Sequence, residues 1–369
     1  MTFTVVGTPG DRRPALFAAA CRSSGLPEPR LVAWTDVLRG ADLDLRPGDL
    51  LRVDSPGEDP EADALLRGPG DPARVGGGAR WYRTFTAALG RLSAAASASG
   101  ARLLGDVEEI AVMFDKRLAH ARLLAAGVPV PPALPEVDGY AALRSRMDEA
   151  GERRVFVKPA HGSSASGVVA LQIAPGRVRA VTSASMTGDV LVNSLRVRAY
   201  DTEHEVAALI DGLAPDGLHV ERWMPKATVG GRVFDLRVVV VDGEPTHAVA
   251  RTSRHPMTNL HLGGARGDLT AVRRALGPDG WRRALAVCAR AAACFPGSLM
   301  VGVDLLVGRG MKRFAVCEVN AFGDLLPGLT GFPGGPAERL DTYAAQVKAV
   351  LAGTWGTSGT TGKTACVTT

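Results

Sequence analysis

Lysine, cysteine and aromatic residues are all scarce in this chain. Only six of its 43 basic residues are lysines, namely Lys116, Lys158, Lys226, Lys312, Lys348 and Lys363. Since arginine is used wherever either residue would serve, each lysine is a candidate for a place that needs a compact ammonium group. The five cysteines are scattered and show no CxxC spacing, which indicates neither a disulfide framework nor a zinc site.

Long apolar runs and basic blocks are also missing. No segment is apolar enough to span a bilayer, and no basic stretch followed by an apolar run marks a secretory signal, so we expect a cytoplasmic protein. The net charge of +5 is spread along the chain, so we expect neither a nucleic acid nor a membrane as partner. The oligomeric state is not indicated.

The first hundred residues alternate between strand and helix patterns. Strands are expected at 3–8, 31–34 and 50–53, with helices at about 13–23, 60–66 and 81–99 and a Gly/Pro-rich loop at 67–80. This alternation predicts a small parallel α/β domain over residues 1–105.

From residue 106 the pattern changes to a larger, mixed region that we expect to extend to 352. Helices are expected from 106, at 116–126, 202–213, 279–294 and 337–351, and strands at 155–158, 168–172, 219–224, 234–241, 247–251, 302–307 and 313–320. The Thr/Gly/Ser-rich tail at 353–369 is expected to be disordered. It contains Gly-Lys-Thr, but Thr357 stands where a phosphate-binding loop needs glycine.

The last two of these strands carry acidic residues. If they form a hairpin centred near Met311, Asp304 lies opposite Glu318, and Asn320 shares the face of Glu318. Carboxylates that face each other repel, so a cation is expected between them. Two acids and an amide suit Mg²⁺, although an exposed hairpin with solvated acids would also fit the pattern.

A Gly/Ser loop follows the strand that ends at Lys158. The segment Gly162-Ser163-Ser164-Ala-Ser-Gly can close its backbone N–H groups on a phosphate, and Lys158 can reach the same phosphate as a point charge. An ordinary flexible hairpin loop is the alternative reading.

A third strand carries Asp235 and Arg237 on one side, and the chain then returns towards Arg251. These residues fit a solvated face, or a set that neutralises the charge of a transferring phosphoryl group.

In chain order, seven segments of the sequence resemble the ATP-grasp superfamily, and especially its branch of ribosomal-protein glutamate ligases and glutathione synthetases. The segments are Asp115-Lys116 with Gly-Val-Pro-Val-Pro, Phe-Val-Lys158-Pro with its loop, Val-Glu221-Arg222-Trp223-Met224-Pro, Asp235-Leu-Arg237, Thr-Asn259-Leu-His-Leu-Gly-Gly, Gly-Val-Asp304-Leu-Leu and Cys-Glu318-Val-Asn320. The resemblance covers about residues 106–330. It implies an α/β (α+β) ATP-grasp fold with a Rossmann-like pre-ATP-grasp domain and a lid at about 150–220.

The resemblance also implies roles for these residues. Lys116, Lys158 and the loop Gly162, Ser163 and Ser164 would contact ATP phosphates. Glu221, Arg222, Trp223 and Met224 would be the hinge that reads adenine. Asp235 would lie near the nucleotide, Arg237, Arg251 and Asn259 would act on the γ-phosphate and acyl phosphate, and Asp304, Glu318 and Asn320 would bind one or two Mg²⁺, with Mn²⁺ as a substitute.

The implied activity is that of a ligase that forms an amide bond. A small-molecule or peptide carboxylate would be phosphorylated by ATP, and an amine would then displace phosphate. A kinase-like phosphotransferase and a non-catalytic nucleotide-binding module are the alternatives. Two departures from the branch limit the transfer: Met257 stands where an arginine is usual, so Arg251 or Arg254 would replace it, and the residues after Asn320 differ where the acceptor site is expected.

Overall fold

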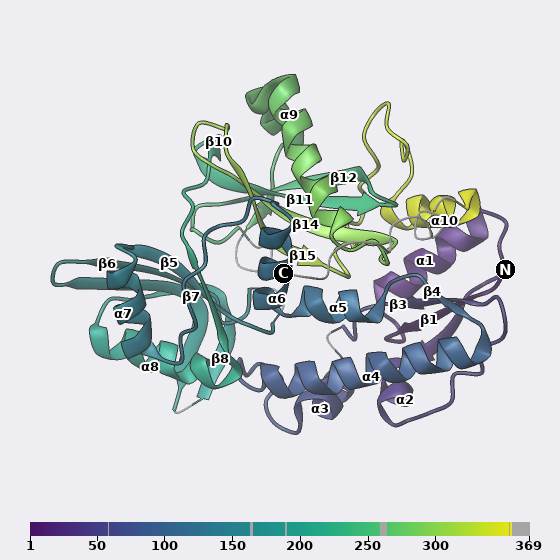
Figure 1. The fold of residues 1–369 in the computed structure, drawn as a ribbon, viewed down its shortest axis with the longest axis horizontal. Helices are drawn as coiled ribbons and strands as arrows, with labels where there is room; N and C mark the ends of the chain where they lie inside the picture. The colour runs from purple at the N-terminus through teal and green to yellow at the C-terminus, as the bar shows by residue number, and fades with distance from the viewer. Residues whose placement is uncertain (58, 163–164, 189, 259–263, 354, 356–369) are drawn as a thin grey trace, which may run out of the picture.

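Three β-sheets and the helices around them make up the part of the chain that the structure describes (Figure 1). The computed structural model describes residues 1–57, 59–162, 165–188, 190–258, 264–353 and 355. Within these residues, no helix combines the length and the apolar character that a membrane crossing requires.

The first sheet is parallel and has the strand order β2-β1-β3-β4. Its strands are β1 (Phe3–Gly7), β2 (Arg30–Ala33), β3 (Leu50–Val53) and β4 (Arg102–Leu103). The helices between them are α1 (Arg12–Ser23), α2 (Trp34–Leu38), α3 (Pro60–Arg67) and α4 (Gly78–Ser99). All residues of β1 and β3 are buried, as expected for parallel strands that are covered on both faces.

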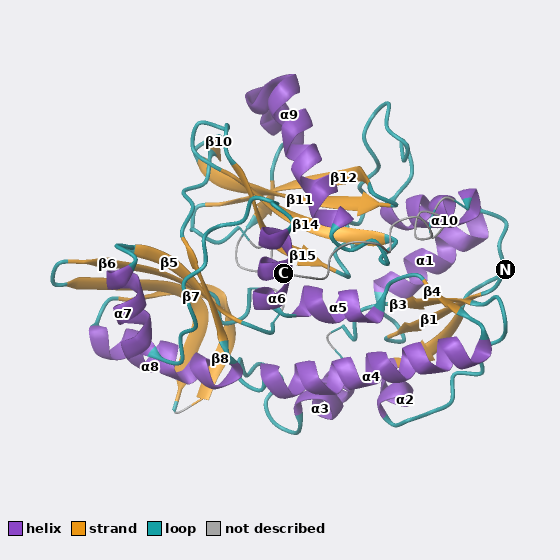
Figure 2. Ribbon diagram, in the orientation of Figure 1, coloured by secondary structure: helices purple, strands orange, loops and turns teal. Residues whose placement is uncertain are grey.

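The second sheet is antiparallel, has the order β8-β7-β6-β5-β9 and forms the region that we call the lid. Its strands are β5 (Arg154–Pro159), β6 (Val169–Ala174), β7 (Arg177–Thr187), β8 (Val190–Tyr200) and β9 (Leu218–Arg222). Helices α7 (Tyr140–Glu149) and α8 (Glu203–Leu213) lie beside this sheet on the left of Figure 2 and supply part of its separate core.

The third sheet is also antiparallel and carries most of the candidate site. Its order is β13-β12-β11-β14-β15, and β10 pairs with β11. The strands are β10 (Thr228–Val229), β11 (Arg232–Val241), β12 (Glu244–Ser253), β13 (Ala265–Arg266), β14 (Met300–Val307) and β15 (Phe314–Asn320). The neighbouring helices are α5 (Val107–Phe114), α6 (Lys116–Ala125), α9 (Leu269–Ala293) and α10 (Thr342–Ala352).

The first sheet is attached differently to the other two. It shares a hydrophobic core with the third sheet and α10, in which Phe3 and Phe17 lie with Val239 and Tyr343. Towards the lid the N-terminal region makes both apolar and polar contacts, since Val75 packs into the core of the lid and its backbone N–H donates to the Leu191 carbonyl at 2.8 Å. The Asp216 carboxylate, for example, accepts the backbone N–H groups of Gly77 and Ala79 at the start of α4, at 2.6 and 3.0 Å.

Most of the expected elements are present, with shifted ends. Trp34 begins α2 instead of ending a strand, and α4 starts at Gly78, inside the expected loop. The helix expected at 279–294 continues back to Leu269 across a kink at Gly277, where φ is 68°. The last helix starts only at Thr342, because Asp341 caps it.

The hairpin of β7 and β8 was not expected from the sequence. Its first strand contains Thr-Ser-Ala-Ser, and these small polar residues hide the apolar alternation by which strands are recognised. Their burial comes from packing within the lid, which a local pattern does not encode.

Candidate functional site

Two of the three expected metal ligands of the acidic hairpin lie directly opposite each other. Asp304 of β14 pairs with Glu318 of β15, and Gly302 pairs with Asn320. The expectation rested on a regular hairpin, but the register shifts beyond Asp304, so the intervening Cys317 has no partner residue in the ladder. This bulge aligns Glu318 with Asp304.

Two arginines from the neighbouring strands neutralise Asp304. Arg237 of β11 forms a bidentate ion pair with the Asp304 carboxylate, and Arg251 of β12 lies 3.0 Å from Asp304 Oδ2. Burial raises the pKa of Asp304, but the guanidinium groups of Arg237 and Arg251 outweigh burial and lower it to about 2. Asp304 is therefore a carboxylate at neutral pH.

Asp235 lies at the centre of a second set of contacts beside the first. Its carboxylate accepts a hydrogen bond from Arg251 Nε at 2.7 Å and another from the Thr258 hydroxyl, and it lies 3.5 Å from Lys226 Nζ. Burial raises the pKa of Asp235, but the positive charges of Arg251 and Lys226 outweigh burial and hold the pKa below its usual value. Arg251 thus connects Asp235 to Asp304, while Arg254 is exposed.

Lys116 connects the acidic hairpin to the Gly/Ser loop. It is the first residue of α6, and its ammonium group donates to the Gly162 carbonyl at 2.7 Å and lies 3.4 Å from Glu318 Oε1. The preceding Asp115 caps the helix and holds the His161 ring at 2.9 Å, which positions the residue before Gly162.

On the lid, Lys158 of β5 forms a buried ion pair with Glu221 of β9 at 2.5 Å. Burial raises the pKa of Glu221, but Lys158 and His219 lower it to about 2. Burial lowers the pKa of Lys158, but Cys317 and Glu221 raise it above its usual value. Since burial raises the pKa of the Cys317 thiol to about 11, this thiol is neutral, and Glu221 supplies the stabilising charge.

The lid and the third sheet meet at this pair. Lys158 Nζ lies 3.3 Å from Cys317 Sγ of β15. A pocket of about 10 Å³ lies nearby between α6 and β15, and Lys116, Cys317 and Glu318 line it together with His219 of the lid. That volume is close to the least that a water molecule needs.

The expected hinge is only partly directed towards the site. The Arg222 side chain is exposed and pairs with Glu152. The backbone N–H of Arg222 donates to the Pro132 carbonyl. The ring of Trp223 packs against Phe156 with centroids 5.0 Å apart. The backbone N–H of Trp223 donates to the Arg154 carbonyl. Met224 lies against Gly308. Among the residues that the structure describes, Glu221 is the one of these four that contacts another expected site residue, Lys158.

Three of the expected residues, Ser163, Ser164 and Asn259, lie outside the described residues. Lys226, Thr258, His219 and Cys317 were not expected at the site. Lys226 could have been found from the scarcity of lysine, and Thr258 and Cys317 from their places in two of the segments that carry the resemblance, but nothing in the sequence indicates His219. Met257, at the position of the usual arginine, is buried in an apolar cluster with Phe156 and Val168 of the lid region.

The residues present fit a magnesium ion in their chemistry. Asp304, Glu318 and Asn320 offer oxygen donors from one face of the hairpin, and the Asn320 amide nitrogen is buried without a hydrogen-bond partner in the described chain. A cluster of three or more His, Cys, Asp or Glu side chains that could bind a metal is absent among the residues described. The two acids would therefore need ligand oxygens to complete the coordination of a metal.

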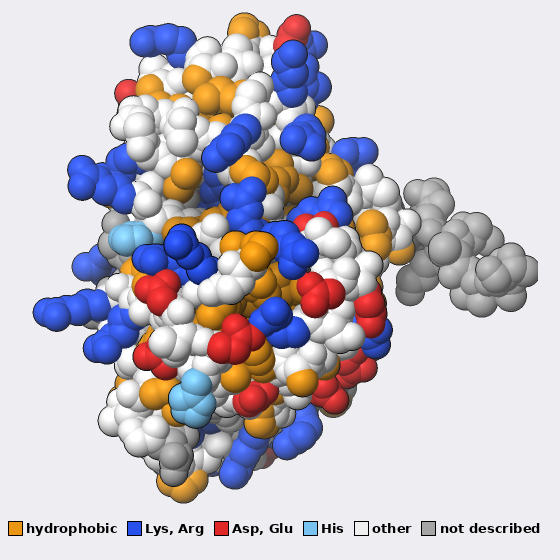
Figure 3. Space-filling view, turned by 90° about the vertical axis from the view of Figure 1, so that its left-hand side faces the viewer, with side chains coloured by type: hydrophobic (Ala, Val, Ile, Leu, Met, Phe, Trp, Pro, Cys, Tyr) orange, Lys and Arg blue, Asp and Glu red, His pale blue; other side chains and the backbone are white. Residues whose placement is uncertain are grey.

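The surface on the lid side carries charges of both signs. Lys and Arg side chains lie across the middle and upper part of the face in Figure 3, and Asp and Glu side chains are mixed with them in its lower half. This face lacks the uniform basic stripe that is typical of nucleic-acid-binding surfaces.

Solved structures with the same fold are ATP-grasp ligases. D-cycloserine synthetase DcsG matches with a TM-score of 0.57 and 18% identity, over 95% of this chain and 99% of that one. ATP-grasp ligase PsnB, solved with a minimal precursor, gives 0.55 and 18% over 95% and 99%. Carboxyaminoimidazole ribonucleotide synthase of Aspergillus clavatus, solved with ATP, gives 0.57 and 12% over 95% and 77%. The chain therefore has the expected ATP-grasp fold with its N-terminal α/β region.

Sequence comparisons alone are less informative. No model of a known protein family matches the chain. A stretch of 203 residues is 29% identical to proteins of Mycobacterium tuberculosis and Mycobacterium bovis described as uncharacterized HTH-type transcriptional regulators. The match covers 52% of this chain and 61% of theirs, so the chain spans less than two thirds of the length of these relatives.

Proposed function

We propose that this protein is an ATP- and Mg²⁺-dependent ligase that joins a carboxylate to an amine through an acyl phosphate and releases ADP and phosphate. The proposal is carried by the meeting of Asp235, Arg237, Arg251 and Asp304 from three adjacent strands of one sheet. The ATP-grasp fold gives these side chains a context in which phosphoryl transfer is the expected chemistry.

The substrates would enter between the two faces of the site. Lys158 and Lys116 would bind ATP phosphates, for which they would give up their present partners Glu221 and Gly162. Asp304, Glu318 and Asn320 would hold the magnesium, which supplies charge neutralisation at the phosphates. The lid, residues 150–220, would close over the nucleotide and exclude water from the reactive intermediate.

Arg237 and Arg251 would act on the transferring group. A carboxylate oxygen of the substrate attacks the γ-phosphorus, the bond to ADP breaks, and the acyl phosphate carries negative charge that the guanidinium groups neutralise. The amine nitrogen then bonds to the acyl carbon, phosphate leaves with the bonding electron pair, and the nitrogen loses a proton. The proposed substrates are small-molecule or peptide carboxylates and amines, and a solved PsnB complex with a precursor peptide supports the inclusion of peptides.

The test is a screen for ADP release with pools of amino acids, peptides and other carboxylates, followed by mass spectrometry of the products. We expect ADP, phosphate and an amide, all of which depend on both substrates. Release of AMP and pyrophosphate would reject the proposal. A stable phosphorylated product would assign the protein to phosphotransferases, and nucleotide binding without turnover in any pool would leave it a binding module.

A further inference from the structure

A buried ion-pair cluster joins the first sheet to the turn that follows the proposed metal ligand Asn320. Arg52 of β3 donates to Asp54 Oδ1 at 2.9 Å, to Asp324 Oδ2 at 2.7 Å and to Gln346 Oε1 of α10 at 2.5 Å. The side chains of Arg52, Asp54 and Asp324 are at most 6% exposed. One guanidinium group thus connects three parts of the chain that are far apart in sequence.

Few other contacts hold the Asp324 carboxylate. Gln346 Nε2 donates to the same oxygen as Arg52, at 3.0 Å. The second oxygen, Oδ1, is buried and has no partner within the described part of the chain. The position of this carboxylate therefore depends on Arg52 and Gln346.

The turn that Asp324 anchors lies against the proposed transfer site. A Cβ atom on Gly323 would come within 2.8 Å of the Gly302 backbone and 3.1 Å of Arg237 Nη1, and the Gly323 carbonyl is 3.5 Å from that same nitrogen. Gly302 is the partner of Asn320 in the ladder. Any shift of the turn would therefore move Asn320 and Arg237 together.

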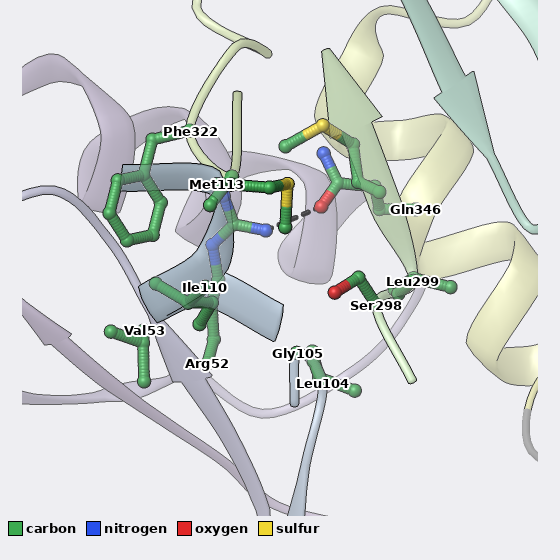
Figure 4. A pocket seen from close by; sticks show the side chains of 12 residues that line it. Arg52, Val53, Leu104, Gly105, Ile110, Met113, Ser298, Leu299, Phe322 and Gln346 are labelled. Atoms are coloured by element: carbon green, nitrogen blue, oxygen red, sulfur yellow. Dashed lines mark hydrogen bonds between the residues drawn. The ribbon is translucent and has the colours of Figure 1, made fainter. Parts of the chain in front are cut away.

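Packing on the other side of the turn is incomplete. A cavity of about 30 Å³ lies beside Ala321 and Phe322, with Arg52, Met113 and Gln346 also in its wall. Figure 4 shows the Arg52 guanidinium pointing across this cavity to the Gln346 amide. The cavity holds no more than about one or two water molecules, while the Phe322 ring of the turn packs against Phe114 with centroids 5.6 Å apart.

We propose that Arg52 is a positioning residue for phosphoryl transfer, which acts through Asp324 to hold the turn that follows Asn320 and contacts Arg237. The inference rests on the proposed ligase function. A lysine cannot replace this arginine, because one ammonium group cannot reproduce the planar fork that serves Asp54, Asp324 and Gln346 together.

The test compares Arg52→Lys, Asp324→Asn and the double variant in the full-length protein. We expect kcat to fall about 10- to 100-fold in each single variant, the range typical of residues that support metal ligands, with the KM for ATP changed less than about threefold. If Arg52 acts through Asp324, the double variant has the same kcat as the less active of the two single variants. The proposal would be overturned if the double variant showed the product of the two single losses in kcat, or if Arg52→Lys had a wild-type kcat.

Loss of stability is separated by a matched control. Leu89→Ala removes a buried side chain from the core of the same N-terminal region, where Leu89 is 1% exposed. It should lower the melting temperature but leave kcat per folded molecule unchanged, whereas Arg52→Lys lowers kcat at temperatures where it is fully folded. If the wild-type protein makes no ADP, the proposed function is refuted. If the wild-type protein is active and Arg52→Lys leaves kcat unchanged, only this inference is refuted.

Discussion

The two faces of the candidate site neutralise their charges in different ways. On the lid, Lys158 and Glu221 form a single buried pair between two strands of one sheet. On the third sheet, Asp235 and Asp304 lie among Lys226, Arg237 and Arg251, so that three cations face two carboxylates.

This difference predicts that the lid and the third sheet have different roles in binding and catalysis. A phosphate that binds Lys158 must compete with Glu221, so the lid face should govern how tightly the nucleotide binds. In this cluster the three cations exceed the two carboxylates by one charge, because the carboxylate of Glu318 on the same sheet lies beside Lys116. The extra charge is available to an anion that gains charge during the reaction. Substitutions on the lid should therefore change binding and stability, and substitutions on the third sheet should change the rate.

The largest effect is expected at Asp304. Asp304→Asn removes one of the two acids of the proposed metal site, and turnover should fall about 1000-fold or more, with weaker binding of Mg-ATP. ADP release and isothermal titration with Mg-ATP measure these two effects. Asp279→Asn, at a 76% exposed side chain of α9, is the matched control and should behave as wild type. Normal turnover in Asp304→Asn would remove the metal assignment.

Arg251 should affect the rate more than binding. Arg251→Met leaves Asp304 paired with Arg237 and Asp235 close to Lys226, so the fold should survive. We expect kcat to fall about 100- to 1000-fold while the KM for ATP changes less than about threefold. Steady-state kinetics measure both constants. A change confined to the KM for ATP would mean that the third sheet, like the lid, contributes to nucleotide binding and not to the rate.

Lys158 should affect binding and stability together. Lys158→Met leaves Glu221 buried without its cation, which should lower the free energy of unfolding by about 3–5 kcal/mol and raise the Kd for ATP about 10- to 100-fold. The double variant with Glu221→Gln should regain most of the stability but not the affinity. Denaturant titration and nucleotide binding test this, and recovery of affinity in the double variant would contradict a phosphate-binding role for Lys158.

The smallest effect is the pH dependence of the lid pair. The pKa of Glu221 is lowered from 4.5 to about 2 in the folded protein, so its contribution to stability is complete above pH 4.5 and is lost as the pH falls towards 2. Glu221→Gln should be less stable than wild type at neutral pH, and this difference should shrink over that window. Denaturant titrations at a series of pH values measure it, and a constant difference would show that the carboxylate keeps its ordinary pKa.

The sequence predicted the fold and much of the site, but not how the site residues contact one another. Asp304 and Glu318 could be paired by counting from the turn, although the count succeeded only because of the bulge at Cys317. The ordered motifs also pointed to Lys116, Lys158 and Arg237, which lie in the same candidate site and whose roles stay predictions. The partners of these residues come from strands and turns far away in the chain, and no local pattern encodes such contacts.

Arg52 illustrates what remained hidden. It lies in a short buried strand of the first region, and its partners Asp324 and Gln346 follow 272 and 294 residues later. A single arginine in an apolar strand gives no sign of such partners. The lid hairpin was missed for a related reason, because its small polar residues become buried only when the sheet assembles.

The central claim is that ATP activates a carboxylate as an acyl phosphate, and transfer of ¹⁸O tests it most directly. The carboxylate found in the substrate screen is labelled with ¹⁸O and incubated with the protein, Mg-ATP and the amine, and the released phosphate is analysed by mass spectrometry. The account predicts one ¹⁸O atom in each phosphate and ADP as the nucleotide product. Unlabelled phosphate, or label recovered in AMP, would contradict it.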